Sequence, residues 1–257
     1  MRIARDESTP PERVTVEPWY RLAVCIVKPA TALVFRRDER GQDRLPRTGG
    51  CIVAVNHISY ADPFVAALFV HDAGRRPRFM GKVSVFNIPV IGRILRGAGQ
   101  IPVYRESADA AHALSAATDA VRAGECVVIY PEATVTRDPD YWPMSAKTGV
   151  ARLALATGAP VIPLAQWGAQ EFLGRGGKPR LGRRTKVQAR AGAPVDLSRW
   201  HGRELTAEVL RESTSAIMDA LTEVLAEIRG GRPTTERYQP GPEERRGSRP
   251  RHQRKSA

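Results

Sequence analysis

The sequence contains little cysteine. Three cysteines occur among its 257 residues, and none stands in a Cys-X-X-Cys pair or in a Cys/His cluster with the spacing of metal ligands. A scaffold held by disulfide bonds needs an even set of cysteines, and a structural zinc site needs closely spaced ligands. The cysteine content therefore excludes both classes, predicts that the protein holds no metal ion, and favours a reducing compartment.

The sequence also lacks long apolar runs. No uninterrupted stretch reaches about 18 apolar residues, the length that a membrane-spanning helix requires. The N-terminal segment MRIARDESTPPERV has no apolar core of the kind found in signal peptides. We therefore expect a protein that stays in the cytoplasm and has no transmembrane helix.

One apolar segment qualifies that expectation. Residues 19–35, WYRLAVCIVKPATALVF, place Arg21 and Lys28 near one another on a helical projection of an otherwise apolar segment. This pattern predicts a helix that lies in a membrane interface while its basic side chains reach lipid phosphates. Pro29 is expected to kink the helix or to split it in two. Packing of the same helix on the protein's own core is the alternative.

Acidic residues are outnumbered by basic ones. The chain has 40 Lys and Arg against 27 Asp and Glu, which gives a formal net charge of +13. Such an excess implies an anionic partner: nucleic acid, a membrane surface or a phosphorylated substrate. Residues 231–257 are basic and have almost nothing apolar to bury, which predicts a disordered tail. Two more basic clusters occupy residues 75–82 and 175–190.

The remaining composition is that of a globular protein. Hydrophobic residues make up 42% and charged residues 26%, which excludes a disordered or fibrous chain. Patterns of buried strands alternate with helical patterns between residues 39 and 230, and this predicts an α/β domain with a mixed, largely parallel sheet flanked by helices. An N-terminal arm, residues 1–38, carries the membrane-associating helical segment. The expected strands are 50–55, 76–82, 100–104, 125–130, 161–166 and 185–191; the expected helices are 62–70, 89–96, 107–123, 148–157 and 205–228.

Ligands of such sheets bind beyond the carboxyl ends of the strands, where the first strand is followed by Asn56-His57-Ile58-Ser59-Tyr60-Ala61-Asp62. If the loop folds back, the Asp62 carboxylate receives the Nδ1 proton of His57, which leaves Nε2 free to accept a proton. Taken alone, this spacing is a weak signal and favours an aspartate that caps a helix beside an incidental histidine.

Three other strand ends support the first interpretation. They read GQIPVYR from residue 99, YPEAT from residue 130, and VIPL from residue 161. In this order and spacing the four segments resemble the glycerolipid acyltransferase family, whose blocks read approximately NHxxxxD, GxIPVxR, FPEGTRS and VIPV. The family is typified by bacterial 1-acylglycerol-3-phosphate acyltransferase, and the resemblance extends over residues 24–191.

The resemblance implies an activity in phospholipid biosynthesis. His57 would be the general base on the free hydroxyl of 1-acylglycerol-3-phosphate, and Asp62 would orient it. The acyl donor would be a thioester of coenzyme A or of acyl-carrier protein, no cofactor would be needed, and the product would be phosphatidate. Lys82 is the candidate for contact with the oxyanion, and Arg105 matches the arginine that binds the acceptor phosphate.

The third block departs from the family pattern. Glu132 and Thr134 stand where the family has them, as candidates for binding or organising the acceptor site, but Ala133 replaces a glycine and Val135 replaces an arginine. Arg137 and Lys147 are the candidates to supply the charge lost at Val135.

The resemblance also implies lysophospholipid and thioester substrates and peripheral contact with anionic lipid at the cytoplasmic face of the cell membrane. Other lysophospholipids or glycolipids remain open as acceptors. A basic nucleic-acid-binding protein is a further alternative, although the sequence has no recognisable module of that kind. A catalytically idle membrane adaptor is disfavoured because His57 and Asp62 are both present.

Overall fold

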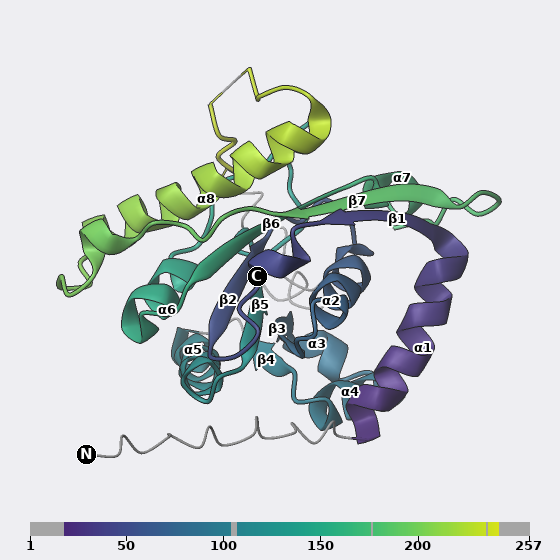
Figure 1. The fold of residues 1–257 in the computed structure, drawn as a ribbon, viewed down its shortest axis with the longest axis horizontal. Coiled ribbons are helices and arrows are strands. Elements are labelled where there is room, and N and C mark those ends of the chain that lie inside the picture. Colours follow the sequence, from purple (N-terminus) through teal and green to yellow (C-terminus); the bar gives the residue numbers. More distant parts are fainter. Residues whose placement is uncertain (1–17, 104–106, 176, 235, 242–257) are drawn as a thin grey trace, which may run out of the picture.

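The computed structural model describes residues 18–103, 107–175, 177–234 and 236–241. Their centre is a seven-stranded sheet in the order β1-β7-β6-β2-β5-β3-β4 (Figure 1). Neighbouring strands are parallel except β6 and β7, which are antiparallel. The strands are β1 (Phe35–Arg40), β2 (Cys51–Val55), β3 (Pro77–Lys82), β4 (Ile101–Val103), β5 (Cys126–Ile129), β6 (Val161–Trp167) and β7 (Thr185–Ala191).

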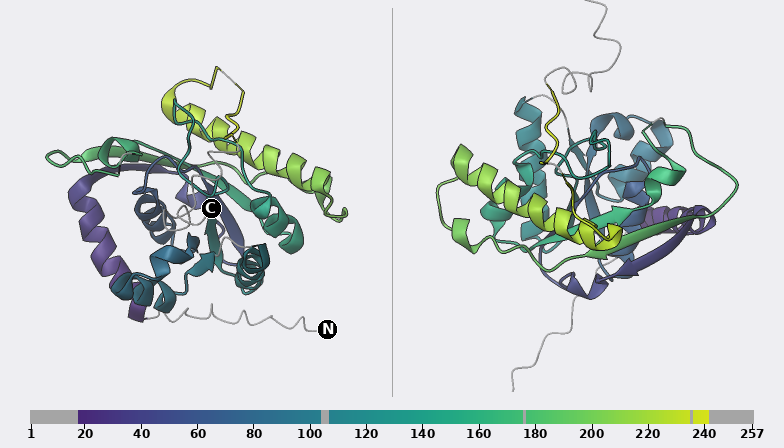
Figure 2. Two further views of the ribbon diagram at one scale, coloured as in Figure 1. Left: turned by 180° about the vertical axis from the view of Figure 1, so that it is seen from behind. Right: turned by 90° about the horizontal axis from the view of Figure 1, so that it is seen from above.

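Helices cover both faces of the sheet (Figures 1 and 2). On one face, α5, α6 and α8 pack against β2, β5 and β6, and on the other α2 packs against the same strands. The central strands β2 (CIVAV) and β5 (CVVI) are buried at every residue, as a strand with helices on both sides must be. The helices are α1 (Pro18–Val34), α2 (Asp62–Asp72), α3 (Val83–Phe86), α4 (Pro89–Gly97), α5 (Ser107–Arg122), α6 (Gly149–Thr157), α7 (Ala169–Phe172) and α8 (Ala207–Arg229), with 3₁₀ turns at Gln42–Arg44 and Ser198–Trp200.

This architecture confirms the predicted α/β fold, and each expected strand and helix of the domain has a counterpart that differs by a few residues at its ends. The strand β1, with the sequence FRRDER, was not expected. It pairs with β7 along its whole length at the edge of the sheet. The expected domain boundary after residue 38 falls inside this strand, so the N-terminal segment is continuous with the sheet.

The helix α1 runs through Pro29 as a single helix, so of the two expected effects of Pro29 the split into two helices does not occur. It packs against α4 and α2, and the Tyr20 hydroxyl lies 2.9 Å from Nδ1 of His71. Its other side leaves Leu22, Ile26 and Leu33 exposed. Within the described residues, no helix has both the length and the apolar character needed to cross a membrane.

The predicted disordered tail is corrected in its first part. Arg232 pairs with Glu223 at 2.6 Å and Arg237 with Asp219 at 2.5 Å, both on α8. The Tyr238 carbonyl accepts a hydrogen bond from the Ser145 amide at 2.9 Å. The chain just after α8 is therefore packed on that helix, whereas residues 242–257 lie outside the described residues.

Candidate active site

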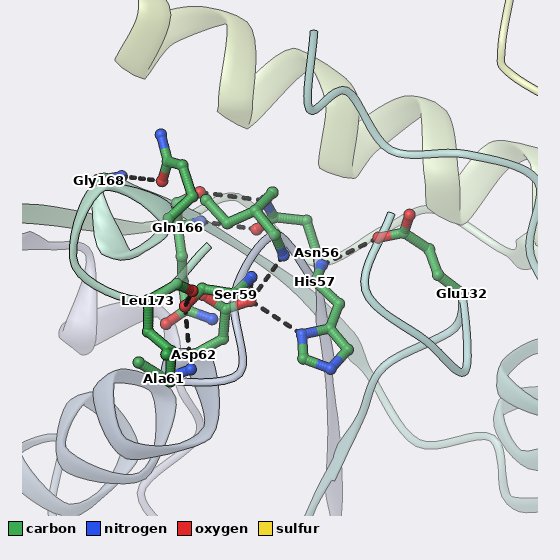
Figure 3. Close-up of polar contacts among 11 residues, drawn as sticks. Asn56, His57, Ser59, Ala61, Asp62, Glu132, Gln166, Gly168 and Leu173 are labelled. Carbon is green, nitrogen blue, oxygen red and sulfur yellow. Dashed lines mark hydrogen bonds and ion pairs between the residues drawn. The ribbon is translucent and has the colours of Figure 1, made fainter. Parts of the chain in front are cut away.

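The pair His57 and Asp62 lies at the carboxyl end of β2, the central strand of the sheet (Figure 3). The chain leaves β2 at Asn56, turns, and enters α2 at Asp62, so the two side chains meet across the turn. His57 Nδ1 lies 2.9 Å from Asp62 Oδ2, and the same oxygen accepts the backbone amides of Ile58 at 2.6 Å and Ser59 at 2.7 Å. An oxygen that accepts two amides receives the Nδ1–H of His57 as a third donor, which leaves Nε2 as the ring nitrogen that can accept a proton.

Burial shapes the electrostatics of the pair. The Asp62 side chain is completely buried, while that of His57 is 15% exposed, so a substrate can reach the imidazole and not the carboxylate. Burial raises the pKa of Asp62, and the bonds from His57 and the two amides oppose that shift. Such a pair is arranged to take a proton at Nε2 and to stabilise the imidazolium that results.

Neighbouring strands fix the turn in place. The side chain of Asn56 donates to the Gln166 carbonyl at 3.0 Å and accepts from the Gln166 amide at 2.7 Å, which ties the end of β2 to β6. The Ser59 hydroxyl donates to the Leu173 carbonyl at 2.6 Å. Sequence reasoning gave neither Asn56 nor Ser59 a role; their position inside the His57–Asp62 segment was the available signal.

Glu132 holds the opposite wall of the site. Its Oε1 accepts the His57 amide at 2.9 Å and its Oε2 accepts the Met144 amide at 3.0 Å. Burial raises the pKa of Glu132 to about 8, against those hydrogen bonds. The expectation that Glu132 binds substrate is corrected, because both of its oxygens face the protein's own backbone; the loop-organising role is the one that the contacts support.

The structure shows the backbone and the burial of the two residues that depart from the third block, Ala133 and Val135. Ala133, where the family block has glycine, adopts a left-handed backbone with φ of 58°. That region costs a residue with a side chain about 1–2 kcal/mol, which explains why glycine suits the position. Val135 stands where the block has arginine, so that position supplies no charged group to the site. Its side chain is buried.

The candidates to replace that charge lie on the same loop. The Thr136 amide donates to the His57 carbonyl at 2.6 Å, and Arg137, which is half-buried, is the next residue along this loop. The Lys147 amide donates to the Pro131 carbonyl at 2.9 Å, and its side chain is exposed.

For the other predicted site residues that the structure describes, it gives a position in the fold and shows no hydrogen bond to the His57–Asp62 pair. Thr134 is half-buried on the same loop, and Lys82 is exposed where β3 ends, at the same edge of the parallel sheet as His57. Arg105 lies outside the described residues. Within the described part of the chain, no cluster of histidine, cysteine and acidic residues has the grouping needed to hold a metal ion.

One aromatic residue beside the pair was not assigned a role. The Tyr130 ring lies 4.5 Å from the His57 ring, centroid to centroid, and stacks on Phe79 at 6.4 Å. Burial raises the pKa of Tyr130 well above its ordinary value, so the phenol is neutral. It therefore forms an apolar wall against one face of the imidazole.

Together the sheet and the paired side chains define an α/β protein with a histidine held ready to accept a proton at the end of its central strand. A family model described as Acyltransferase matches residues 36–167, just over half of the chain. The chain belongs to this family.

Similar proteins agree with that assignment. The chain is 28% identical over 144 residues to the 1-acyl-sn-glycerol-3-phosphate acyltransferase BAT2, chloroplastic, of Brassica napus, which covers 55% of this chain and 40% of that protein. It is 32% identical over 127 residues to the lysophospholipid acyltransferase LPEAT1 of Arabidopsis thaliana, covering 46% of this chain and 29% of that protein. The matched region thus spans two fifths or less of these relatives.

The fold is shared with a solved structure. The crystal structure of the 1-acyl-sn-glycerophosphate acyltransferase PlsC from Thermotoga maritima superposes with a TM-score of 0.62, covering 86% of this chain and 81% of that one. At 23% sequence identity, this likeness establishes the arrangement of strands and helices.

Proposed function

We propose that this protein transfers a fatty acyl group from a thioester to the free hydroxyl of 1-acylglycerol-3-phosphate and so forms phosphatidate. The observation that carries the proposal is the His57–Asp62 pair: Nδ1 lies 2.9 Å from a buried carboxylate, and the His57 side chain is 15% exposed. The similarity to acyltransferases that act on lysophosphatidate supports this choice of acceptor.

The chemistry follows from that geometry. His57 Nε2 takes the hydroxyl proton as the acceptor oxygen forms a bond to the thioester carbonyl carbon, and the carbonyl becomes a tetrahedral oxyanion. When the oxyanion collapses, the carbon–sulfur bond breaks and the imidazolium returns its proton to the leaving thiolate. A positioned base contributes about 10²–10⁴-fold to such a reaction, and Asp62 stabilises the charged ring while it holds the proton.

Basic residues complete the proposed site. In this proposal Lys82 stabilises the oxyanion and Arg105 binds the acceptor phosphate. Arg137 or Lys147 supplies the charge that Val135 does not, and Thr134 offers a hydroxyl beside them. Neither coenzyme A nor acyl-carrier protein acts as a cofactor here, since each is the carrier of the acyl donor.

We also propose peripheral attachment to the cytoplasmic face of the membrane, because both substrates carry acyl chains. Exposed apolar side chains support this attachment. On α1 they are Leu22, Ile26 and Leu33, and in the segment that forms α3 and α4, of which α4 packs on α1, they are Val85, Ile88, Val90 and Ile91. Phe64, in the first turn of α2, is exposed as well.

A second acceptor class has a specific observation in its favour. Because Val135 is buried where the family block has arginine, the site has lost one donor for a free phosphate. An acceptor whose phosphate carries a larger head group would need that donor less. Acylation of another lysophospholipid is therefore the second candidate function, and the similarity to a lysophospholipid acyltransferase agrees with it.

An acceptor panel separates the two. The purified chain is assayed with one labelled acyl-coenzyme A, and in parallel with acyl-carrier protein, against lysophosphatidate, other lysophospholipids and a glycolipid acceptor. The proposal expects lysophosphatidate to give the highest kcat/KM. Preference for an acceptor with a larger head group would select the second candidate, and absence of transfer to every acceptor would reject both.

A further inference from the structure

The guanidinium of Arg229, the last residue of α8, lies over the rings of two tryptophans. Its Cζ is 3.8 Å from the ring centroid of Trp142 and 4.3 Å from that of Trp167. One of its nitrogens donates to the Asp140 carbonyl at 2.8 Å. A guanidinium over an aromatic face is attracted by the ring, and tryptophan is the strongest partner. Arg229 therefore joins the end of α8 to the end of β6 and to the loop that follows β5.

Both tryptophans belong to segments that hold the turn of the active pair. The Trp142 carbonyl accepts the Thr136 hydroxyl at 2.8 Å, and the Thr136 amide donates to the His57 carbonyl at 2.6 Å. Trp167 directly follows the residue of β6 whose backbone exchanges two hydrogen bonds with the Asn56 side chain. A few contacts thus connect the end of α8 to the backbone that carries the imidazole.

The turn under the guanidinium is tightly built. Asp138 Oδ1 accepts the amides of Asp140 at 2.9 Å and Trp142 at 3.1 Å. Tyr141 has a left-handed backbone with φ of 62°, which a bulky residue keeps only where its surroundings enforce it. Arg175, after α7, lies over the Tyr141 ring with its Cζ 4.0 Å from the centroid, and it donates to the Asp138 carbonyl. A second arginine therefore holds the same turn.

We propose that Arg229 and Arg175 are positioning residues, which clamp the turn at residues 138–142 and so keep its loop bonded to the carbonyl of His57. Glu132, on the same loop, accepts the amide of that histidine, so the loop holds both backbone polar groups of the residue. A base works only within hydrogen-bond reach of the proton that it takes, and a small misplacement caused by a distant residue lowers the rate.

Hydrogen exchange followed by mass spectrometry tests the clamp without substrate. Arg229→Met keeps much of the length of the side chain and removes its charge and its donors. Exchange at the amides of residues 136–145 and 57–59 should become about tenfold faster, while exchange in β5 should stay that of the parent. Unchanged exchange in both segments would overturn the proposal.

Arg199→Met is the matched control. Arg199 also lies over a tryptophan, with its Cζ 5.5 Å from the ring centroid of Trp200, and it also pairs with α8, through Glu212 at 3.7 Å. These contacts lie near the first residues of α8, whereas the clamp is at its last. Exchange at the active turn should equal that of the parent. Equal acceleration in the control and in the clamp variant would indicate a general loss of stability and would overturn the proposal.

Arg175→Met tests the clamp from its other side, and it keeps the proposal open to refutation if Arg229→Met does not fold. It removes the contact with Tyr141 and the bond to Asp138 and leaves α8 as it is. Exchange in residues 136–145 should again be faster than in the parent. Unchanged exchange there would contradict the role of this arginine.

The inference rests on the proposed function for its effect on rate. In acyl transfer, Arg229→Met should lower kcat by about tenfold and leave KM for the acyl donor within about twofold of the parent, because the base loses its place while the thioester still binds. An unchanged kcat would overturn the positioning role. Faster exchange in a chain without transferase activity would refute the function and leave the clamp intact.

Discussion

Glu132 carries the clearest consequence of burial at a single residue. A carboxyl whose pKa is raised from 4.5 to about 8 keeps its proton in the folded protein at pH values where the unfolded chain has lost it. Below about pH 4.5 both states are protonated, and the contribution of this group to stability is fully present. It is lost as the pH rises through about 8.

Urea denaturation at pH 5, 6.5 and 8 measures this effect. The unfolding free energy of the parent should fall across that range, and the fall should be roughly 2–4 kcal/mol smaller in Glu132→Gln, which cannot titrate. The comparison concerns the slope with pH, because the amide also alters the bonds to the backbone at every pH. Identical slopes for the two proteins would show that Glu132 is ionised in the folded state throughout.

Replacing Ala133 by glycine should increase the stability of the fold. Relief of its left-handed backbone by glycine, worth about 1–2 kcal/mol, exceeds the added flexibility of the unfolded chain, about 0.5–1 kcal/mol. Ala133→Gly should therefore raise the unfolding free energy by about 0.5 kcal/mol in urea denaturation. Ala116→Gly, at an exposed position within α5, is the control and should lower it by about 1 kcal/mol. Equal losses at both positions would contradict the backbone explanation.

The pair could be predicted from the sequence, and its supports could not. The spacing of His57 and Asp62 predicts their contact only together with the three other blocks that resemble the family. The role of Glu132 depends on two backbone amides from segments far apart in the sequence, His57 and Met144, which no local pattern reveals. The buried position of Val135 likewise depends on how the loop folds.

At the scale of elements, strand β1 shows why one strand escaped prediction. FRRDER has no alternation of apolar and polar residues, and the buried strands β2, β5 and β6 are recognisable because they are continuously apolar. β1 is a strand because β7 offers it a parallel partner at the edge of the sheet, where the exposed charges of Arg36 and Arg40 discourage further pairing.

The helix α1 gives the prediction for the membrane. Leu22→Gln/Ile26→Gln removes exposed apolar surface from α1 and should release the protein from anionic vesicles at high salt, where only apolar insertion resists screening. Leu181→Gln, at an exposed leucine distant in sequence from α1, is the matched control. Flotation with liposomes measures both. Unchanged flotation of the double variant at high salt would place the attachment elsewhere.

At the scale of the whole molecule, part of the positive charge is committed to the fold. Arg75, in one of the basic clusters, is buried and donates to the carbonyls of Pro46, Gly49 and Gly124. Arg78 pairs with Glu125 at 2.6 Å. Arg237 pairs with α8 in the segment expected to be disordered. These residues stabilise the protein internally, which weakens the case that the net charge marks a nucleic-acid-binding surface.

The order in which strand and helix patterns follow one another in the sequence predicted most of the architecture. Alternating buried strands and helices admit few arrangements other than a largely parallel sheet. The position of β7 was beyond that reasoning. It runs antiparallel to β6 and brings β1 into the sheet, a result of long-range pairing that the residues of β7 do not encode locally.

The central claim is that His57 is the base for acyl transfer to a lysophosphatidate hydroxyl. The most direct measurement is the rate of labelled acyl transfer from acyl-coenzyme A to 1-acylglycerol-3-phosphate by the purified parent and by His57→Ala, with equal folding verified by circular dichroism. The account predicts transfer by the parent and a loss of at least about 10²-fold in the variant. Residual activity above about one per cent of the parent rate would contradict the assignment of His57 as an obligatory base.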